Sequence, residues 1–165
     1  MHIRRAAWRD LSEILVLARA FFDELALDGF TFEENSVVEY LAPLIRGGER
    51  HYFALAVADG QIVGAVSGHI HRYWFSPEKV LFDDFFYVPP DKRGGLIAYR
   101  LWKSMRDWGA AQGVAALSHG VLTGINPDNA TRFFTGMGMT FCGGIFRLPL
   151  SPSAAALVPQ NIAAA

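Results

Sequence analysis

The segment from residue 81 to residue 98 places the strongest constraint on how this chain folds. It begins with an apolar run that carries two acids, Asp83 and Asp84, and that stops at two consecutive prolines. A basic, glycine-containing turn follows, and a helix is predicted to begin near Leu96. The first turn of a helix has unpaired backbone N–H groups and partial positive charge, and glycines let an anion approach that backbone. The segment therefore predicts a strand, a turn and a helix start that bind an anion such as a pyrophosphate.

Two other phosphate-binding patterns fit this segment less well. The chain lacks the Gly-Lys-Ser/Thr of a P-loop, and it lacks the Gly-x-Gly-x-x-Gly of a dinucleotide-binding turn. The order of strand, prolines, arginine and glycines therefore has to be matched to a different kind of phosphate site.

Residues 88–98 read Val-Pro-Pro-Asp-Lys-Arg-Gly-Gly-Leu-Ile-Ala. This resembles motif A of the GNAT family of N-acetyltransferases, which bind acyl-coenzyme A and whose pattern is roughly Val-x-Pro-x-x-Arg-Gly-x-Gly-x-Gly/Ala. The matching positions are Val88, Pro90, Arg93, Gly94 and Ala98. Leu96 stands where the family usually has glycine, and Gly95 comes one position early.

The amino-acid composition limits which classes of protein this chain can belong to. The 165 residues are 52% hydrophobic and 19% charged, which predicts one ordered domain over residues 1–150. The net charge of -1 argues against a nucleic-acid partner, and no apolar run reaches the ~20 residues of a membrane helix. With one cysteine, Cys142, and no apolar signal segment at the start, the expected location is cytoplasmic, with no internal disulfide.

Capping signals and hydrophobic periodicity predict the order β-α-α-β-β-β-α-β-α-β. Asp10 with Glu13 and Thr31 with Glu34 are expected to cap the first two helices, and Asp59-Gly60 predicts a hairpin. The GNAT resemblance implies the same order and an α/β (α+β) fold, with a mixed, mostly antiparallel central sheet and helices on both faces. The expected strands are 3–5, 52–57, 61–74, 81–88, 114–122 and 140–148, and the expected helices are 10–26, 31–46, 96–112 and 126–138.

Residues 151–165 are rich in alanine, serine and proline. A frayed end is one interpretation. The preferred hypothesis is that this tail packs on its own domain or on a partner subunit, which makes a homodimer possible.

The family resemblance implies a site for acetyl-coenzyme A or coenzyme A. The pyrophosphate is expected at the helix start, on Arg93, Gly94, Gly95, Leu96, Ile97 and Ala98. The pantetheine arm is expected to pair with the backbone of Phe86, Tyr87 and Val88, where this strand separates from the strand over 114–122. The backbone N–H of Val88 is the expected oxyanion donor. Asn126 and Asn129 bracket the position of the family's cofactor-binding asparagine, and each is equally well explained as a helix cap.

Asp84 occupies the position where many family members carry a glutamate, so it is the expected catalytic or amine-binding residue. Asp83 must point to the opposite face of the strand. A structural role remains open for both acids, because a buried carboxylate needs a partner. His69, His71 and His119 are further candidate bases or hydrogen-bonded fillers, and no metal site is expected.

These features predict an acetyl-coenzyme A-dependent N-acetyltransferase acting on a small-molecule or peptide amine by direct attack in a ternary complex. The alternative is a catalytically silent acyl-coenzyme A-binding module, since Phe134 stands where the family usually has a proton-donating tyrosine. A toxin-like enzyme that acetylates aminoacyl-tRNA is a third interpretation, and the near-neutral charge argues against it.

Overall fold

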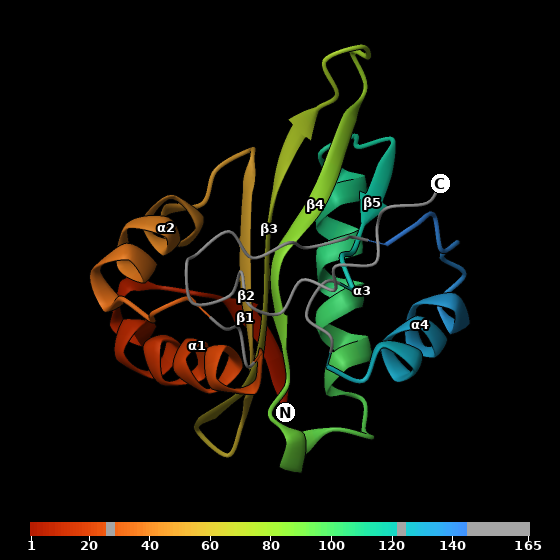
Figure 1. Ribbon diagram of the computed structural model, residues 1–165. Coiled ribbons are helices and arrows are strands. Elements are labelled where there is room, and N and C mark those ends of the chain that lie inside the picture. Colours follow the sequence, from red (N-terminus) through yellow and green to blue (C-terminus); the bar gives the residue numbers. More distant parts are fainter. Residues whose placement is uncertain (26–28, 122–124, 145–165) are drawn as a thin grey trace, which may run out of the picture. The chain divides into compact units, whose positions relative to one another are not determined.

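The computed structural model describes residues 1–25, 29–121 and 125–144 (Figure 1). They fall into two units, one made of residues 1–21 and 33–120 and the other of residues 22–32 and the chain from 121 onward. Among the described residues, no helix has the length and apolar character needed to cross a membrane. The elements are β1 (His2–Arg5), η1 (Trp8–Asp10), α1 (Leu11–Leu25), α2 (Glu34–Arg46), β2 (His51–Ala58), β3 (Gln61–Arg72), β4 (Lys79–Tyr87), η2 (Pro90–Lys92), α3 (Ile97–Ala111), β5 (Ala116–Ser118) and α4 (Pro127–Gly136).

The first unit is a sheet with the strand order β1-β2-β3-β4-β5. The pairs β1–β2, β2–β3 and β3–β4 are antiparallel, and β5 runs parallel to β4. Helices cover both faces: α1 and α2 lie over one, and α3 lies over the other (Figure 1). The prediction of a mixed, mostly antiparallel sheet between helices is confirmed.

Two apolar clusters hold the helices to the sheet, and side-chain alternation along the strands separates them. On the α1 and α2 face, Ile14, Leu17 and Leu44 pack on Phe53 and Leu55. The α3 face has its own cluster, which includes Val66, Leu81, Leu101 and Met105. Burial of these side chains supplies the main driving force for forming the sheet.

Glycine-dependent turns lie where the sequence predicted them. Asp59 and Gly60 have φ angles of 51° and 79°, the double positive φ of a type I′ hairpin. Gly47 (φ 72°) follows the last residue of α2, and Gly113 (φ 69°) lies two residues beyond the end of α3. These turns confirm the hairpin and both predicted helix ends.

The predicted capping boxes are wrong in detail. Asp10 ends the turn η1, and its carboxylate accepts hydrogen bonds from Arg4 and from the backbone N–H of Ala7. The residue before α2 is Glu33, which makes no side-chain capping hydrogen bond, so Thr31 is not the cap. The carboxylate of Asp10 is thus bound by Arg4 of β1 and by the N–H of Ala7.

The predictions for the C-terminal part of the chain are tested only where its residues are described. The predicted strand over 114–122 is shorter than expected, because β5 spans only Ala116–Ser118. Residues 140–144 contain no strand, and residues 145–148 and the tail 151–165 lie outside the described residues. In the second unit, α4 begins after Asn126, whose φ of 43° is left-handed, and the rings of Phe133 and Phe134 lie 5.2 Å apart.

Replacing Asp10 with asparagine should lower the free energy of unfolding by about 2–4 kcal/mol at pH 7. Asp10 is 4% exposed, and its carboxylate accepts hydrogen bonds from both terminal guanidinium nitrogens of Arg4 at 2.7 Å. The hydrogen bond from Arg4, and then that from Ala7, hold the pKa of Asp10 below its usual value. This stabilisation is present above the ordinary carboxyl pKa of about 3.9 and is lost as the pH falls through the lower folded value. Urea unfolding from pH 7 to pH 2 measures it.

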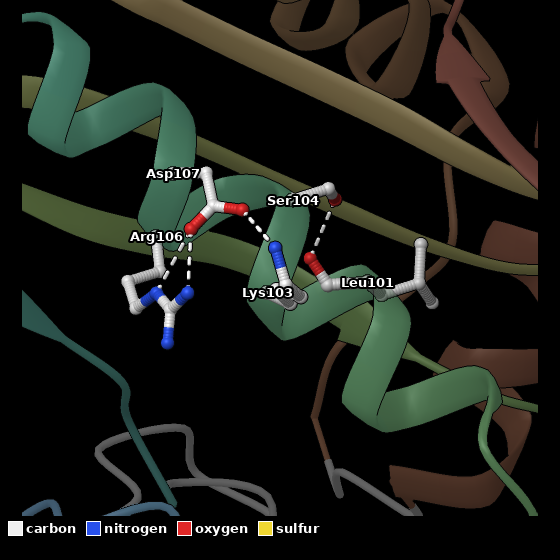
Figure 2. A network of polar contacts seen from close by, with 5 residues as sticks. All are labelled: Leu101, Lys103, Ser104, Arg106 and Asp107. Carbon is white, nitrogen blue, oxygen red and sulfur yellow. Dashed lines mark hydrogen bonds and ion pairs between the residues drawn. The ribbon is translucent and has the colours of Figure 1, made fainter.

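Asp107 provides a matched control for this prediction. On the exposed side of α3 it pairs with Lys103 at 2.5 Å and with Arg106 at 2.7 Å (Figure 2). Exposed ion pairs contribute about 0–1 kcal/mol, so Asp107→Asn should change stability little. Equal losses in the two variants would contradict the structural role given to Asp10.

Candidate active site

A β-bulge in β4 determines where Asp84 points. Ser67 of β3 pairs with Phe85 and Gly68 pairs with Asp83, so Asp84 is an extra residue without a partner in the ladder. A bulge of this kind turns successive side chains toward one face. Asp84 therefore lies on the same face as Phe85, which packs on the α1 and α2 cluster.

Only glycine fits opposite this bulge. A Cβ atom at Gly68 would lie 2.2 Å from the carbonyl oxygen of Phe82 and 2.3 Å from Cε of Met105. The missing side chain lets β3, β4 and α3 approach closely at this point. Gly68 is therefore part of what positions Asp84.

Asp84 is held by an imidazole and lies beside a phenol. Its side chain is 7% exposed, and its Oδ1 accepts a hydrogen bond from Nδ1 of His69 at 2.7 Å. Burial, followed by the negative charge of Asp84, raises the pKa of Tyr40 well above its usual value. Tyr40 consequently keeps its proton throughout the physiological range and can act only as a neutral group.

These side chains surround a pocket of about 320 Å³ between α2 and the sheet. The pocket contains two acids and neither a lysine nor an arginine, which favours a cationic ligand. Its lining residues are Glu39, Tyr40, Pro43, Leu44, His51, His69 and Asp84.

The strands β4 and β5 separate directly beside Asp84. Their parallel pairing covers Val80–Phe82 and Ala116–Ser118, and no pairing between β4 and β5 is found after Phe82 in the described residues. This agrees with the expected separation of the two strands. Backbone groups on this edge of β4 are therefore placed to pair with an extended ligand.

Asp83 lies at the point of separation and faces away from the Asp84 pocket, as alternation predicted. Its Oδ1 accepts a hydrogen bond from the backbone N–H of Gly120 at 2.8 Å, and its Oδ2 lies 3.3 Å from Nδ1 of His119. His119 is 1% exposed and contacts the ring of Phe86. Asp83 thus joins the ends of the two separating strands.

The other two histidines have different neighbours. The ring of His71 lies 4.5 Å from Phe82 and 5.4 Å from His69. In the part of the chain that the structure describes, no group of three potential ligands is placed to hold a metal ion. Of the three candidate histidines, His69 is the one that donates a hydrogen bond to Asp84 within the described residues.

The turn after β4 has the open backbone that an anion site needs. Added Cβ atoms at Gly94 (φ 85°) and Gly95 would meet nothing within 4 Å. The helix α3 begins after Leu96, which is 61% exposed, and no side chain caps its first turn. Nε of Arg93 donates to the carbonyl oxygen of Val88 at 2.8 Å, which holds the turn against the strand end.

The remaining predicted cofactor residues divide between the two units. Phe86 packs on the α3 side, and Tyr87 is 4% exposed beside Phe21 on the other face, and a backbone contact of either with the cofactor stays a prediction. Asn126 and Asn129 belong to the second unit. The Asn126 carbonyl accepts N–H bonds from α4, and the Asn129 side chain accepts one from Arg132. A cofactor role for these asparagines stays a prediction.

Solved structures share this fold. The tetramutant of the BH1408 protein from Bacillus halodurans is 21% identical, with a TM-score of 0.70 over 91% of this chain and 100% of the other. Ribosomal-protein-alanine N-acetyltransferase from Brucella melitensis biovar Abortus 2308 is 17% identical, with a TM-score of 0.67 over 90% and 100%. Aminoglycoside N-acetyltransferase AAC(6')-Iy in complex with CoA is 16% identical, with a TM-score of 0.73 over 90% and 93%.

Comparison with curated proteins finds no match. The family comparison is decisive: the Acetyltransferase (GNAT) family matches residues 11–139, which include β2 to β5, the turn before α3, and α4. This confirms the prediction of an acyltransferase with acetyl-coenzyme A as its donor. The chain belongs to the Acetyltransferase (GNAT) family.

Proposed function

We propose that this protein moves an acetyl group from acetyl-coenzyme A to an amine that binds in the Asp84 pocket, by direct attack in a ternary complex. The observation that carries the proposal is the position of Asp84. It lies in a bulge beside the point where β4 leaves β5, and it faces an acidic pocket. A thioester lying along the open edge of β4 would then end close to an amine in the pocket.

The proposed cofactor path follows β4 from its end to its middle. The pyrophosphate would bind at the first turn of α3, where backbone N–H groups lack a side-chain cap and the helix dipole favours negative charge. The pantetheine arm would pair with the backbone of Phe86, Tyr87 and Val88. Open space above Gly94 and Gly95 supports this placement, because phosphate oxygens need to approach the backbone closely.

The oxyanion donor is better placed near the bulge than at Val88. Val88 lies four positions beyond Asp84 in the chain, a distance of about 13 Å along an extended strand. An oxyanion donor must lie about 3 Å from the oxygen that it stabilises. If the amine attacks the thioester beside Asp84, a backbone N–H of β4 next to Asp84 is within reach of the carbonyl oxygen, and we propose that one for the role. Val88 keeps its proposed contact with pantetheine.

An amine must lose a proton before it attacks, and the ordinary acidities decide which side chain suits that task. An alkylammonium ion resembles lysine, with a pKa of about 10.4, against about 3.9 for aspartate and about 6.5 for histidine. Moving the proton to an aspartate is uphill by about 6 units, or about 9 kcal/mol, and to a histidine by about 4 units, or about 5 kcal/mol. The imidazole is the better acceptor.

We therefore propose a division of labour between Asp84 and His69. Asp84 attracts the ammonium group and fixes His69 through Nδ1, which leaves Nε2 free to take the proton. His69 has a side chain 43% exposed, so it can pass that proton to solvent. On this proposal the amine nitrogen then attacks the thioester carbonyl, a C–N bond forms and the C–S bond breaks. The second proton of the attacking nitrogen passes to the leaving thiolate, and coenzyme A is released as the free thiol.

Replacing Arg93 with glutamate should weaken acetyl-coenzyme A binding by tenfold or more. The new carboxylate would stand beside the pyrophosphate, and the bond from Arg93 to the Val88 carbonyl would be lost. Calorimetric titration measures the affinity, and thermal unfolding checks that the fold is kept.

Arg106→Glu is the charge-matched control. Arg106 lies on α3, thirteen residues beyond Arg93, beside Asp107 (Figure 2). At that separation a surface charge is largely screened at physiological salt. An unchanged affinity in Arg93→Glu, or an equal loss in Arg106→Glu, would move the proposed cofactor site elsewhere.

Release of free thiol from acetyl-coenzyme A over a panel of primary amines tests the proposed function. We expect thiol release that depends on the amine and an acetylated product detectable by mass spectrometry. Tight binding of acetyl-coenzyme A without turnover of any amine would favour the silent binding module instead.

A further inference from the structure

A row of aromatic rings leads away from the Asp84 pocket along the β3–β4 hairpin. We call His71, Tyr73, Phe75 and Phe82 the aromatic row. The ring of His71 lies 4.5 Å from Phe82 and 5.8 Å from Tyr73, and Tyr73 stacks on Phe75 at 5.2 Å with an interplanar angle of 5°. The rings therefore form one continuous surface.

The aromatic row is accessible. The β3–β4 hairpin extends beyond the ends of β2 and β5, so its tip has no neighbouring strand (Figure 1). Tyr73 is 41% exposed and Phe75 is 67% exposed. Exposed aromatic rings that lie together are a common feature of binding surfaces.

The aromatic row is continuous with the acidic pocket. His69, whose Nδ1 bonds Asp84, has its ring 5.4 Å from that of His71. Asp84 and Phe82 occupy the same strand two residues apart, and both contact histidines of β3. His69 thus links the carboxylate of Asp84 to His71, the first ring of the aromatic row.

We infer that the acceptor is an arylalkylamine, a primary amine joined by a short chain to a flat aromatic ring. This inference rests on the proposed function. The ammonium group binds between Asp84 and Glu39, where the pocket contains neither lysine nor arginine, and the ring stacks on the aromatic row. The charge of the pocket selects the amine, and the aromatic row selects its flat substituent.

The spacing sets the length of the linker. Two residues along a strand span about 7 Å, which separates the position of Asp84 from that of Phe82. A linker of two or three carbon atoms between nitrogen and ring covers about this distance once the nitrogen sits a hydrogen-bond length from the carboxylate. 2-Phenylethylamine and tryptamine satisfy this requirement, whereas n-butylamine offers the charge without the ring.

Equilibrium binding tests the inference independently of turnover. 2-Phenylethylamine, n-butylamine and 1,5-diaminopentane are titrated into the protein saturated with coenzyme A, and binding is followed by calorimetry. We expect 2-phenylethylamine to bind about tenfold more tightly than n-butylamine. Phe82→Leu and Tyr73→Leu, which keep apolar volume but remove the ring, should each weaken its binding about three- to tenfold and leave n-butylamine unchanged.

Trp74→Leu is the matched control. Trp74 is next to Tyr73 and 93% exposed, and the described structure gives it one ring contact, with Phe75. Trp74→Leu should leave the affinity for 2-phenylethylamine and for n-butylamine unchanged. Equal binding of 2-phenylethylamine and n-butylamine, tighter binding of 1,5-diaminopentane, or equal losses in Trp74→Leu and Phe82→Leu would overturn the inference.

The same titrations separate this inference from the proposed function. If 2-phenylethylamine binds with the predicted dependence on Phe82 but no acetylated product forms, the aromatic subsite stands and acetyl transfer fails. If other amines are acetylated while 2-phenylethylamine does not bind, acetyl transfer stands and the arylalkylamine assignment is overturned.

Discussion

Replacing Asp84 with asparagine should lower kcat for amine acetylation by about 100-fold or more, while acetyl-coenzyme A affinity changes less than twofold. The variant keeps the size of the side chain but removes the charge that attracts the ammonium group and fixes Nδ1 of His69. Groups that position or transfer a proton contribute about 10²- to 10⁴-fold. Steady-state kinetics with saturating donor, together with donor titration, measures both quantities.

Two companion variants make this result specific. His69→Gln should lose activity to a similar degree, because it removes the proposed proton acceptor and leaves Asp84 in place. Asp83→Asn is the control: Asp83 accepts a hydrogen bond from the Gly120 N–H and lies 3.3 Å from Nδ1 of His119, on the other side of β4, so this variant should lower the free energy of unfolding and change kcat little. Full activity in Asp84→Asn would make Asp84 a structural residue.

Replacing Gly68 with alanine should destabilise the fold by about 3 kcal/mol or more. The new methyl group would overlap the backbone carbonyl of Phe82 at 2.2 Å and Cε of Met105 at 2.3 Å. Met105 can rotate away, but the carbonyl belongs to the sheet and can move only if β3 and β4 separate. A typical domain has only 5–15 kcal/mol of stability, so the loss is large. Urea unfolding measures it.

Gly136→Ala is the control for this prediction. Gly136 closes α4, and a Cβ atom there would meet nothing within 4 Å. Alanine is a better helix former than glycine by up to about 1 kcal/mol, so this variant should be neutral or slightly stabilising. If Gly68→Ala were equally harmless, the close approach of β3, β4 and α3 at the bulge would be wrong.

Periodicity and turn chemistry were sufficient to predict most of the first unit. The Asp59-Gly60 hairpin, the glycine after α2 and the start of α3 each depend on local preferences that a few residues express. The family motif lies on the same local pattern, so the turn before α3 was also located, and its anion binding stays a proposal. Local rules predict local structure well because the stabilising contacts lie within one or two turns of chain.

Features that depend on distant contacts were missed. The capping boxes failed because Asp10 finds Arg4 of β1, a partner that helix periodicity does not reveal. β5 is short because the strands separate after Phe82, which depends on the whole sheet. A partner in another element outweighs a helix-capping preference when it binds a buried charge with two hydrogen bonds.

The residues that line the pocket were also predicted only in part from the sequence. Asp84 was identified by its motif position, but its pairing with His69 required the bulge. Gly68 in the interior of a strand was the signal for such an irregularity. Tyr40 was not among the residues proposed for the site, because it belongs to no motif. Its place beside a carboxylate follows only from how α2 packs on the sheet.

Calorimetric titration with acetyl-coenzyme A tests the central claim most directly, with coenzyme A and ATP as comparison ligands. The open turn before α3 and the free edge of β4 predict micromolar binding of both coenzyme A forms and none of ATP, which lacks the pantetheine arm. Absence of coenzyme A binding would contradict the account, because neither the anion-binding turn nor the separated strands would then have a ligand.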